Sequence, residues 1–299
     1  MSDGRLEDDA MEDRSVDDHG AREKGLRLTK HHGSGNDFLV LLESTADEGV
    51  SPLEVQALCD RHRGIGADGV IVGRPGSDGA DLSMELTNAD GSRAEMSGNG
   101  IRCLLQAAVL SGMVAEGEVT VDTDAGRRSV RFYVRGPGLG FGEVDMGPVL
   151  IGDDLPLDVP PLSAAGAGVV ARACTVDVGN PHLVVIPGDI EPELDRIGPD
   201  LEREFDQGVN VEVIRLVGTA GHRSPDKVFN LIDMDVWERG VGITDSCGTG
   251  ACAAAAAANK WGLVGTDVEV RTCGGSLDVR IETGRVILAG PAQLVGEMY

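Results

Sequence analysis

The chain carries a cysteine where a glycine-rich loop is expected to turn into a helix. Cys247-Gly248-Thr249-Gly250 leads into an alanine-rich run that includes residues 253–258, and alanine is the strongest helix former. The free backbone N–H groups of such a helix start bind anions. The positive end of the helix dipole is expected to lower the pKa of the Cys247 thiol, which would provide a thiolate base near neutral pH. A free cysteine is more often a buried apolar side chain, but the flanking glycines favour the chemical role.

A second segment repeats this design about 150 residues earlier. Ser97-Gly98-Asn99-Gly100 precedes an apolar helical run, residues 104–110. Both segments place a polar, hydrogen-bearing side chain first, followed by glycine, a small polar residue and glycine. Two such helix starts that face each other could hold one carboxylate between them.

A facing pair of helix starts suits one kind of reaction, the removal and return of a proton next to a carboxylate. Such a proton is a very weak acid, so the charge that moves onto the carboxylate must be stabilised. Converging backbone donors in a site without water can do this. An acid–base group on each face then removes the proton on one side and returns it on the other. We therefore expect inversion at carbon without a cofactor or a metal.

Composition narrows the partners and the compartment. The 299 residues include 50 acids and 26 bases, a formal net charge of −24, and such a surface repels nucleic acid and anionic membranes. No stretch approaches the about 20 apolar residues of a membrane span, and the N-terminus lacks the pattern of an export signal. The six cysteines are too few for a disulfide scaffold and lack zinc-site spacing. The sequence thus predicts a cytoplasmic protein with a small-molecule amino-acid substrate, and a homodimer is one assembly that it allows.

The elements that must position the two helix starts are mostly short strands. Alternating or apolar runs predict strands at residues 26–30, 38–42, 70–73, 81–87, 118–122, 128–134 and 142–146, and again at 174–178, 183–186, 210–216, 227–237, 267–272, 277–282 and 286–289. A capping box opens a further helix at Ser51 that should end near Gly64, and residues 191–205 predict a helix interrupted around Gly198-Pro199. Strands, an anion-binding helix start and more strands occur twice. This order predicts an α+β fold of two pseudo-repeated, mostly antiparallel lobes with the site between them.

The domain boundaries follow from the same pattern. Residues 1–24 hold nine acids and four bases with hardly any large apolar side chain, so residues 1–25 are expected to be a disordered acidic tail. Residues 26–147 together with about 288–299 form the predicted N-terminal lobe, and residues 148–287 form the C-terminal lobe. The acidic stretch 147–168, rich in glycine and proline, is expected to connect the two lobes.

Eight motifs along the chain, read in order, resemble those of the diaminopimelate epimerase family. The resemblance covers about residues 27–297, and eight motifs in register are far more specific than any one of them. They are Gly33-Ser34-Gly35-Asn36-Asp37-Phe38, Gly64-Ile65-Gly66-Ala67-Asp68, Asn88-Ala89-Asp90-Gly91-Ser92, Ser97-Gly98-Asn99-Gly100-Ile101-Arg102-Cys103, Gly179-Asn180-Pro181-His182, Asn210-Val211, Glu238-Arg239-Gly240 and Cys247-Gly248-Thr249-Gly250-Ala251.

The resemblance implies an activity, a fold and a set of binding residues. The activity is a pyridoxal-independent epimerase that interconverts LL- and meso-diaminopimelate in lysine biosynthesis, on two lobes of β-sheet wrapped round central helices. The N–H groups of Asn99, Gly100, Gly248 and Thr249, next to Gly98, would hold the reacting carboxylate. The substrate's amino groups and its far carboxylate would be recognised by Asn36, Asn88, Asn180, Asn210, Glu238 and Arg239. His182 is expected to be a supporting core residue, and Asp37, Asp68 and Asp90 to be turn or packing residues.

One position departs from the family pattern. Where the epimerases carry their first catalytic cysteine, this chain has Ser97, and a hydroxyl is a far weaker acid than a thiol with a pKa of about 8.5. Cys103 is an unsuitable substitute, because six residues of helix rise about 9 Å. Three accounts stay open: an introduced Cys→Ser change, a native serine that relays a proton or positions a water while Cys247 does the difficult abstraction, or another use of the scaffold. Of these we favour an epimerase, with reduced turnover or a strong asymmetry between directions.

Two other classes of function compete with this interpretation. A proline or hydroxyproline racemase shares the expected scaffold, but a substrate with one charged end has no use for Glu238, Arg239 and the asparagines. A catalytically silent amino-acid-binding protein is the alternative outside the enzymes, and only Ser97 motivates it. Binding of diaminopimelate against proline, together with exchange of the α-proton, separates the three classes.

Overall fold

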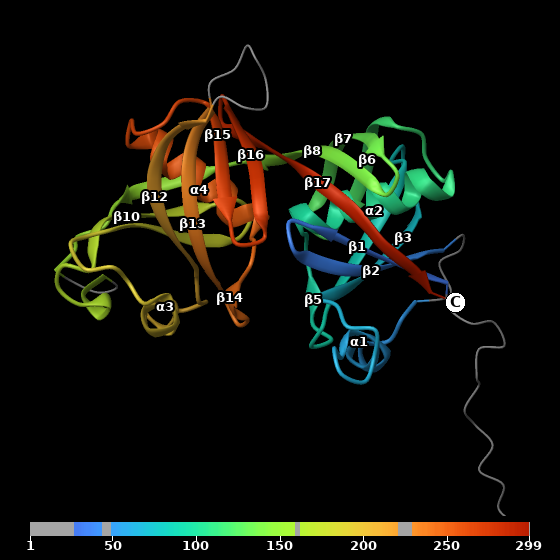
Figure 1. Cartoon of the computed structure of the whole chain (residues 1–299), viewed down its shortest axis with the longest axis horizontal. Helices are drawn as coiled ribbons and strands as arrows, with labels where there is room; N and C mark the ends of the chain where they lie inside the picture. Colours follow the sequence, from blue (N-terminus) through green and yellow to red (C-terminus); the bar gives the residue numbers. More distant parts are fainter. Residues whose placement is uncertain (1–26, 44–48, 159–161, 221–228, 299) are drawn as a thin grey trace, which may run out of the picture.

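The computed structural model describes residues 27–43, 49–158, 162–220 and 229–298. They form two lobes joined side by side (Figure 1). The predicted acidic tail, residues 1–25, lies outside the described residues. None of the described helices is long and apolar enough to cross a membrane.

The first lobe is a closed barrel of strands. β2 and β3, which precede and follow α1 in the chain, pair in parallel, and so do β4 and β6, which precede and follow α2. The other neighbouring strands are antiparallel. The last strand closes the barrel, because it pairs with both β8 and β1. The elements are β1 (Leu28–Gly33), β2 (Asn36–Leu42), α1 (Pro52–Cys59), β3 (Gly69–Pro75), β4 (Leu82–Asn88), β5 (Arg93–Ala94), α2 (Gly98–Ser111), β6 (Gly117–Thr123), β7 (Gly126–Gly136), β8 (Leu139–Pro148) and β17 (Arg285–Met298).

The second lobe repeats this order and these pairings. β11 and β12 are parallel across α3, and β13 and β15 are parallel across α4. β9 continues from β8 and pairs with β10, while β16 pairs with β17. The elements are β9 (Leu150–Asp154), a 3-10 turn (Leu162–Ala165), β10 (Val170–Asp177), β11 (Pro181–Pro187), α3 (Leu194–Arg203), β12 (Asn210–Ala220), β13 (Phe229–Glu238), β14 (Gly242–Thr244), α4 (Gly248–Lys260), β15 (Asp267–Thr272) and β16 (Gly275–Glu282).

Two long strands belong to both lobes. The first residues of β17 pair with β16, and its last residues pair with β1, so the strand runs from one barrel into the other (Figure 1). β8 pairs along nearly its own whole length with the first part of β17, residues 285–293. The confirmed fold class is therefore two related barrels that share a pair of strands. We keep the boundaries 26–147 plus 288–299 and 148–287 as proposed domain limits.

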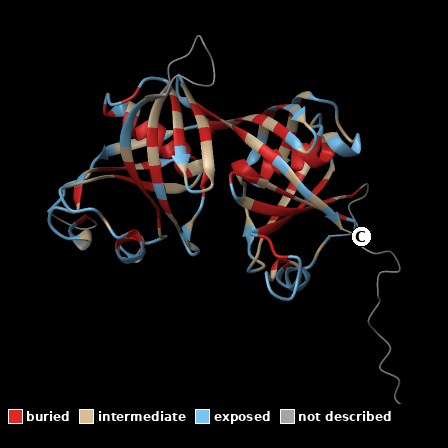
Figure 2. Ribbon diagram, in the orientation of Figure 1, coloured by how far each residue is buried: buried red, intermediate tan, exposed pale blue. Residues whose placement is uncertain are grey.

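One helix fills the centre of each barrel. In α2 every residue from Gly98 to Ala108 is buried, and in α4 the alanines 253–258 are all buried (Figure 2). A helix that is apolar on every side needs surroundings that cover every side, and a closed barrel provides them. The alanine side chains of α4 are small enough to let the strands approach closely. The barrels therefore hold both helix starts in fixed positions.

Several predicted elements differ from those in the structure. α1 ends at Cys59, five residues before Gly64, and the predicted connection 147–168 contains β9. α3 continues through Pro199, because proline's fixed φ is helical and only one backbone hydrogen bond is lost; the buried Ile197 and Leu201 anchor the helix to the second core. β17 continues far beyond residue 289, since its second half is needed to close the first barrel.

Candidate active site

The two helix starts have the same local geometry. Ser97 and Cys247 are the N-cap residues of α2 and α4, both extended, with φ and ψ of −136° and 125° for Ser97 and −125° and 117° for Cys247. Ser97 Oγ accepts a hydrogen bond from the Gly100 N–H at 3.0 Å, and Cys247 Sγ accepts one from the Gly250 N–H at 3.4 Å. Each cap bonds the N–H three residues on, as N-cap side chains do.

The helix starts contact each other through glycines. A Cβ placed on Gly248 would lie 3.6 Å from Gly98 Cα and 3.8 Å from the backbone nitrogen of Asn99. The same Cβ would clash with Leu288 of β17 at 2.9 Å, and a Cβ on Gly98 would clash with it at 2.6 Å. A side chain at either position would therefore have to displace the end of the Leu288 side chain. In the described part of the chain, the N–H groups of Asn99, Gly248 and Thr249 have no hydrogen-bond acceptor, so donors from both helices are free to bind one anion.

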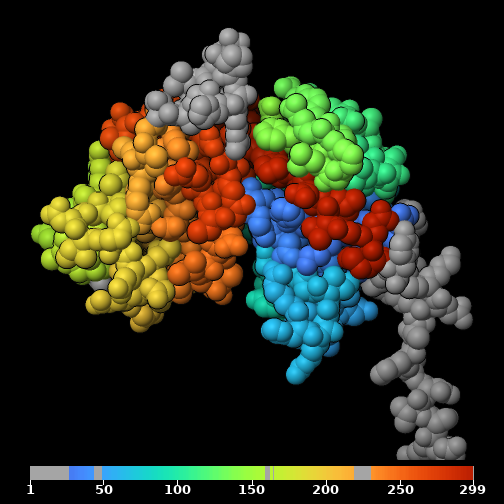
Figure 3. All heavy atoms as spheres, viewed as in Figure 1, coloured from blue at the N-terminus to red at the C-terminus, as the bar shows by residue number. Residues whose placement is uncertain are grey.

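A cavity of about 750 Å³ opens at the contact between the helix starts. The surface is hollowed where the lobes meet, between α1 and β14 (Figure 3). The sequence-predicted residues that line the cavity are Asn36, Asn88, Ser97, Gly98, Asn99, Asn180, Asn210, Glu238, Arg239, Cys247, Gly248 and Thr249. The structure thus brings positions 97 and 247 together, along with all but one of the proposed binding residues.

Gly100 is the exception. It does not line the cavity, and its N–H donates to Ser97 Oγ. Because the N-cap side chain accepts from this donor, its role in binding the substrate carboxylate stays a prediction. Gly100 instead needs to be small, since a Cβ there would lie 3.1 Å from Ile71 Cδ1.

Hydrogen bonds to neighbouring side chains hold the asparagines of the first lobe in place. Asn36 donates through Nδ2 to Asp68 at 2.7 Å, and its Oδ1 accepts from the Asn99 side chain at 3.4 Å. Asn88 donates to Ser92 Oγ at 3.1 Å within its own turn. These bonds fix the direction of each amide while the residues still line the cavity.

In the second lobe Asn180 is linked to a buried histidine–glutamate pair, and Asn210 is held by backbone groups. Asn180 donates to Thr249 Oγ1 at 3.4 Å, and its Oδ1 lies 2.9 Å from His182 Nε2. His182 Nδ1 lies 2.7 Å from Glu212 Oε1, and both side chains are fully buried. Asn210 donates to the Pro181 carbonyl and accepts from the Arg239 N–H, each at 2.9 Å. His182 therefore supports the position of Asn180, as expected.

Glu238 and Arg239 bring charge to the cavity from the end of β13. Burial raises the pKa of the Glu238 carboxyl, and the hydrogen bond from Thr244 Oγ1 at 2.5 Å opposes that rise. Arg239 is exposed, and its Nη1 donates to the Gln207 carbonyl at 2.9 Å. A carboxylate and a guanidinium on adjacent residues can pair with an ammonium and a carboxylate of one ligand.

The expected effect of the helix dipole on Cys247 is outweighed. The pKa of the Cys247 thiol lies well above its ordinary value, first because the side chain is buried and then because Glu238 and Glu212 are close. Hydrogen bonds from Thr249 and the Gly250 N–H act in the opposite direction but are weaker. The prediction of a lowered pKa is therefore wrong, because desolvation and two nearby carboxyls exceed the effect of the dipole.

Arg61, which the sequence motifs did not indicate, lines the cavity together with the predicted turn and packing residues Asp68 and Asp90. Arg61 bonds both Asp37, at 2.7 Å, and Asp68, at 2.8 Å. Asp68 in turn accepts from Asn36, so the three charges fix the rim on the first-lobe side. Arg61 lies after α1 in a polar turn, and only the fold brings it to the cavity.

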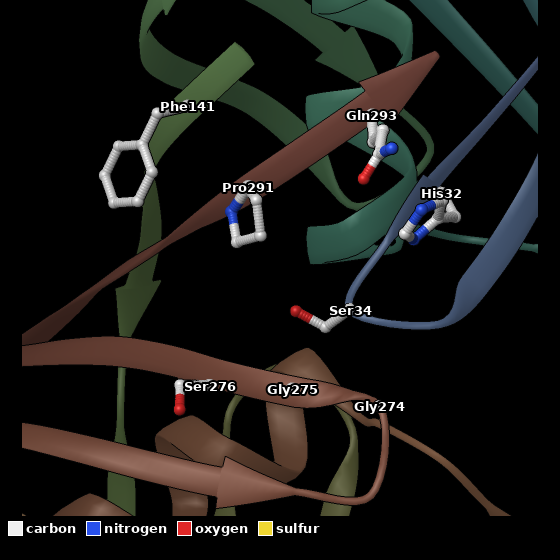
Figure 4. A pocket seen from close by; sticks show the side chains of 8 residues that line it. All are labelled: His32, Ser34, Phe141, Gly274, Gly275, Ser276, Pro291 and Gln293. Carbon is white, nitrogen blue, oxygen red and sulfur yellow. The ribbon is translucent and has the colours of Figure 1, made fainter. Parts of the chain in front are cut away.

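A second, smaller cavity lies elsewhere between the lobes. It measures about 410 Å³ and is lined by the turn after β1, the turn before β16 and part of β17 (Figure 4). His32, Ser34, Ser276 and Gln293 supply its polar side chains. No predicted site residue and no helix start lines it, so the larger cavity is the candidate active site.

The sequence of this chain matches the pattern of the diaminopimelate epimerase family over residues 28–151 and 174–295. A diaminopimelate epimerase of Synechocystis is 38% identical over 285 residues, which cover 90% of this chain and 97% of the relative. The corresponding protein of Magnetococcus marinus is 40% identical over 280 residues, 90% of this chain and 94% of the relative.

Solved structures with low sequence identity share the fold. A phenazine biosynthesis protein of the PhzF family from Bacillus anthracis superposes with a TM-score of 0.64 at 14% identity, over 91% of this chain and 98% of the other. A probable proline racemase from Agrobacterium radiobacter, solved with bound carbonate, gives 0.63 at 17% identity over 92% of each chain. These similarities describe architecture alone, whereas the sequence matches are close enough to show the family. This chain belongs to the diaminopimelate epimerase family.

Proposed function

We propose that this protein is a cofactor-independent isomerase that interconverts LL- and meso-2,6-diaminopimelate in lysine biosynthesis. The observation that carries the proposal is the meeting of two helix starts, capped by Ser97 and Cys247, in one cavity. Relatives named diaminopimelate epimerase at 36–40% identity support the substrate. The proline racemase and PhzF structures are too distant in sequence to favour another substrate.

The reacting carboxylate would lie between the helix starts. The free N–H groups of Asn99, Gly248 and Thr249 would donate to its oxygens and stabilise the negative charge that develops as the α-carbon becomes planar. Donors held at fixed positions by buried helices need no rearrangement when that charge appears. This arrangement lowers the barrier to proton removal without an electron-withdrawing cofactor.

Cys247 would exchange the α-proton on one face of the carbon. Its thiolate removes the proton from one stereoisomer, and its thiol returns a proton to the planar intermediate in the reverse direction. On the other face Ser97 would relay a proton or hold the water that supplies it, because a serine hydroxyl is too weak an acid to form the base itself. Both directions use both residues, so net interconversion should be slow in either direction, and the asymmetry should appear as unequal exchange of the α-proton with solvent from the two stereoisomers.

The far end of the substrate would be recognised at the cavity rim. Diaminopimelate has an ammonium and a carboxylate at each end, so Glu238 can pair with an ammonium and Arg239 with a carboxylate. The amides of Asn36, Asn88, Asn180 and Asn210 can donate to or accept from either group. We place the reaction in the cytoplasm, where reducing conditions suit the six unpaired cysteines.

Incubation with each stereoisomer tests the proposal. LL-diaminopimelate should give the meso form and the reverse, as measured by chiral chromatography, and calorimetry should detect binding of diaminopimelate but not of proline. Binding and racemisation of proline would indicate the racemase class instead. Tight binding of diaminopimelate without any α-proton exchange in D2O would indicate a silent binding protein.

A further inference from the structure

One buried cation near the helix starts has no acidic partner. Arg102, in the second turn of α2, is fully buried, and none of its hydrogen bonds within the described residues goes to a carboxylate. By contrast, the buried or half-buried Lys30 and Arg74 each form ion pairs. A buried charge without a counter-ion is costly, so its retention in the core calls for a function.

The guanidinium of Arg102 holds the first turn of α2 and ties it to β17. Nη1 donates to the Gly98 carbonyl at 2.9 Å, and Nη2 donates to Asn99 Oδ1 at 2.6 Å. Nε donates to the Pro291 carbonyl at 3.3 Å. Gly98 and Asn99 line the active-site cavity, so the charge lies one residue behind the surface that faces the ligand.

The other helix carries no such charge. Arg102 is the fifth residue after Ser97, and the fifth residue after Cys247 is Cys252, a buried thiol. Burial lowers the pKa of Arg102 to about 10, which leaves the group fully charged at neutral pH. The fixed positive charge therefore sits on the side of the site where Ser97 replaces a cysteine.

We propose that Arg102 is a positioning residue whose positive charge, acting through Gly98 and Asn99, stabilises the carboxylate bound between the helix starts. This inference rests on the proposed function for the identity of the substrate, but the anion-binding part stands independently of it. The bound carboxylate would be the counter-ion that the described core lacks. The effect should grow as negative charge moves onto the carboxylate, so turnover should suffer more than binding.

A purely structural role would give a different result. If Arg102 only ties α2 to β17, its replacement should lower the melting temperature without changing the response to anions. Arg74 provides a matched control, because it is largely buried in the same lobe, forms ion pairs with Glu43 and Glu85 and does not line the cavity. Arg74→Met should lower stability and leave turnover per folded molecule within about twofold.

The test compares the wild type with Arg102→Met, Arg102→Lys and Arg74→Met. The first readout is the rise in melting temperature caused by about 100 mM acetate, a minimal carboxylate, against chloride at equal ionic strength. The second readout is turnover of diaminopimelate, resolved into kcat and KM. We expect Arg102→Met to lose the acetate effect and to lower kcat on the order of tenfold to a hundredfold, with a smaller change in KM. Arg102→Lys should recover part of both.

The two readouts separate the inference from the proposed function. The inference is overturned if acetate does not stabilise the wild type, or if it stabilises Arg102→Met equally well. It is also overturned if Arg102→Met keeps the kcat of an active wild type. A wild type that responds to acetate through Arg102 but does not turn over diaminopimelate would overturn the proposed function alone.

Discussion

The starts of α2 and α4 share a backbone geometry but rest on different surroundings. A Cβ on Gly100 would meet Ile71 and Met84, at 3.1 and 3.2 Å, so the residues beneath Ser97 are apolar. At the matching position of α4, a Cβ on Gly250 would lie 2.7 Å from the carboxylate of Glu212, which pairs with His182. The start of α2 thus rests on apolar side chains, whereas the start of α4 rests on ionisable ones.

This difference assigns different tasks to the two halves. Cys247 has the carboxyl groups of Glu238 and Glu212 nearby, and both act on its pKa. Ser97 has no ionisable group among its hydrogen-bond partners in the described chain, and the nearby charge is the fixed cation of Arg102. If the proposed function holds, the two halves of this repeated fold contribute differently, with the thiol on one side and the buried cation of Arg102 on the other.

Removal of the thiol should produce the largest effect. Cys247→Ala is expected to lower α-proton exchange by about a thousandfold or more, because the thiol is the group proposed to remove the proton at that face. Deuterium incorporation into diaminopimelate, followed by mass spectrometry, measures the loss. Cys273→Ser, at an exposed cysteine, should keep the wild-type rate. Substantial exchange in Cys247→Ala would assign the proton transfer to the other half.

Restoration of symmetry should produce the next largest effect. Ser97→Cys places a thiol in a cap position whose geometry already accommodates one at Cys247. We expect net interconversion to speed up by about a hundredfold in both directions, because the equilibrium fixes the ratio of their kcat/KM values. Exchange of the α-proton with solvent should become similar from the two stereoisomers. Initial rates from each pure stereoisomer measure this. A variant with unchanged rates in both directions would show that Ser97 does not limit the reaction.

Arg239 should affect binding more than chemistry. If its guanidinium clamps the far carboxylate, Arg239→Ala should raise KM about tenfold to a hundredfold, with a small change in kcat. Arg215→Ala is the control, because Arg215 forms ion pairs with Glu191 and Asp235 in the same lobe and does not line the cavity. A large fall in kcat without a change in KM would place Arg239 next to the reacting carbon instead.

Glu238→Gln should give the smallest effect, a change in melting temperature whose sign follows from the raised pKa of Glu238. Because burial raises the folded-state pKa of Glu238, the carboxyl favours the fold at low pH, and this contribution is lost as the pH rises through the unfolded and then the folded pKa. Near pH 7 the variant should therefore melt about two to four degrees higher than the wild type. At about pH 4 the gain should shrink, since the wild-type carboxyl is then largely neutral.

The same variant should alter the pH dependence of the reaction. The nearby Glu238 carboxylate helps to raise the pKa of Cys247, so exchange should increase with pH as the thiolate forms. Loss of that charge should move the rising limb of the pH profile of kcat/KM to lower pH. A limb that stays in place would show that Glu238 and Cys247 do not interact as the structure indicates.

Much of the fold and of the site could be predicted from sequence, because both depend on local patterns. The paired Gly-X-Gly segments marked the two helix starts, and the repeated order of strands predicted two lobes. Asn180 and Asn210, expected at the site from the resemblance to the family rather than from local patterns, also line the cavity. The helix starts and the strands depend on a few neighbouring residues, which a sequence displays directly.

The features that escaped prediction depend on residues distant in sequence. The raised pKa of Cys247 arises first from burial, then from Glu238 and from Glu212, the latter 35 residues away in the chain. The hydrogen bond from the Gly100 N–H to Ser97 depends on the side-chain rotamer of Ser97. The burial of Arg102 away from any carboxylate of the described residues appears only when the barrel is assembled. The second half of β17 was missed because its pairing with β1 joins opposite ends of the described chain.

The asymmetry between the two helix starts can be measured most directly by deuterium exchange in D2O, before interconversion, from pure LL- and pure meso-diaminopimelate. The wild type should incorporate deuterium at least about ten times faster from the stereoisomer whose α-proton faces Cys247 than from the other. Ser97→Cys should remove that difference. Equally fast exchange from both stereoisomers in the wild type would contradict the account, because it would require Ser97 to act as a base as good as a thiolate.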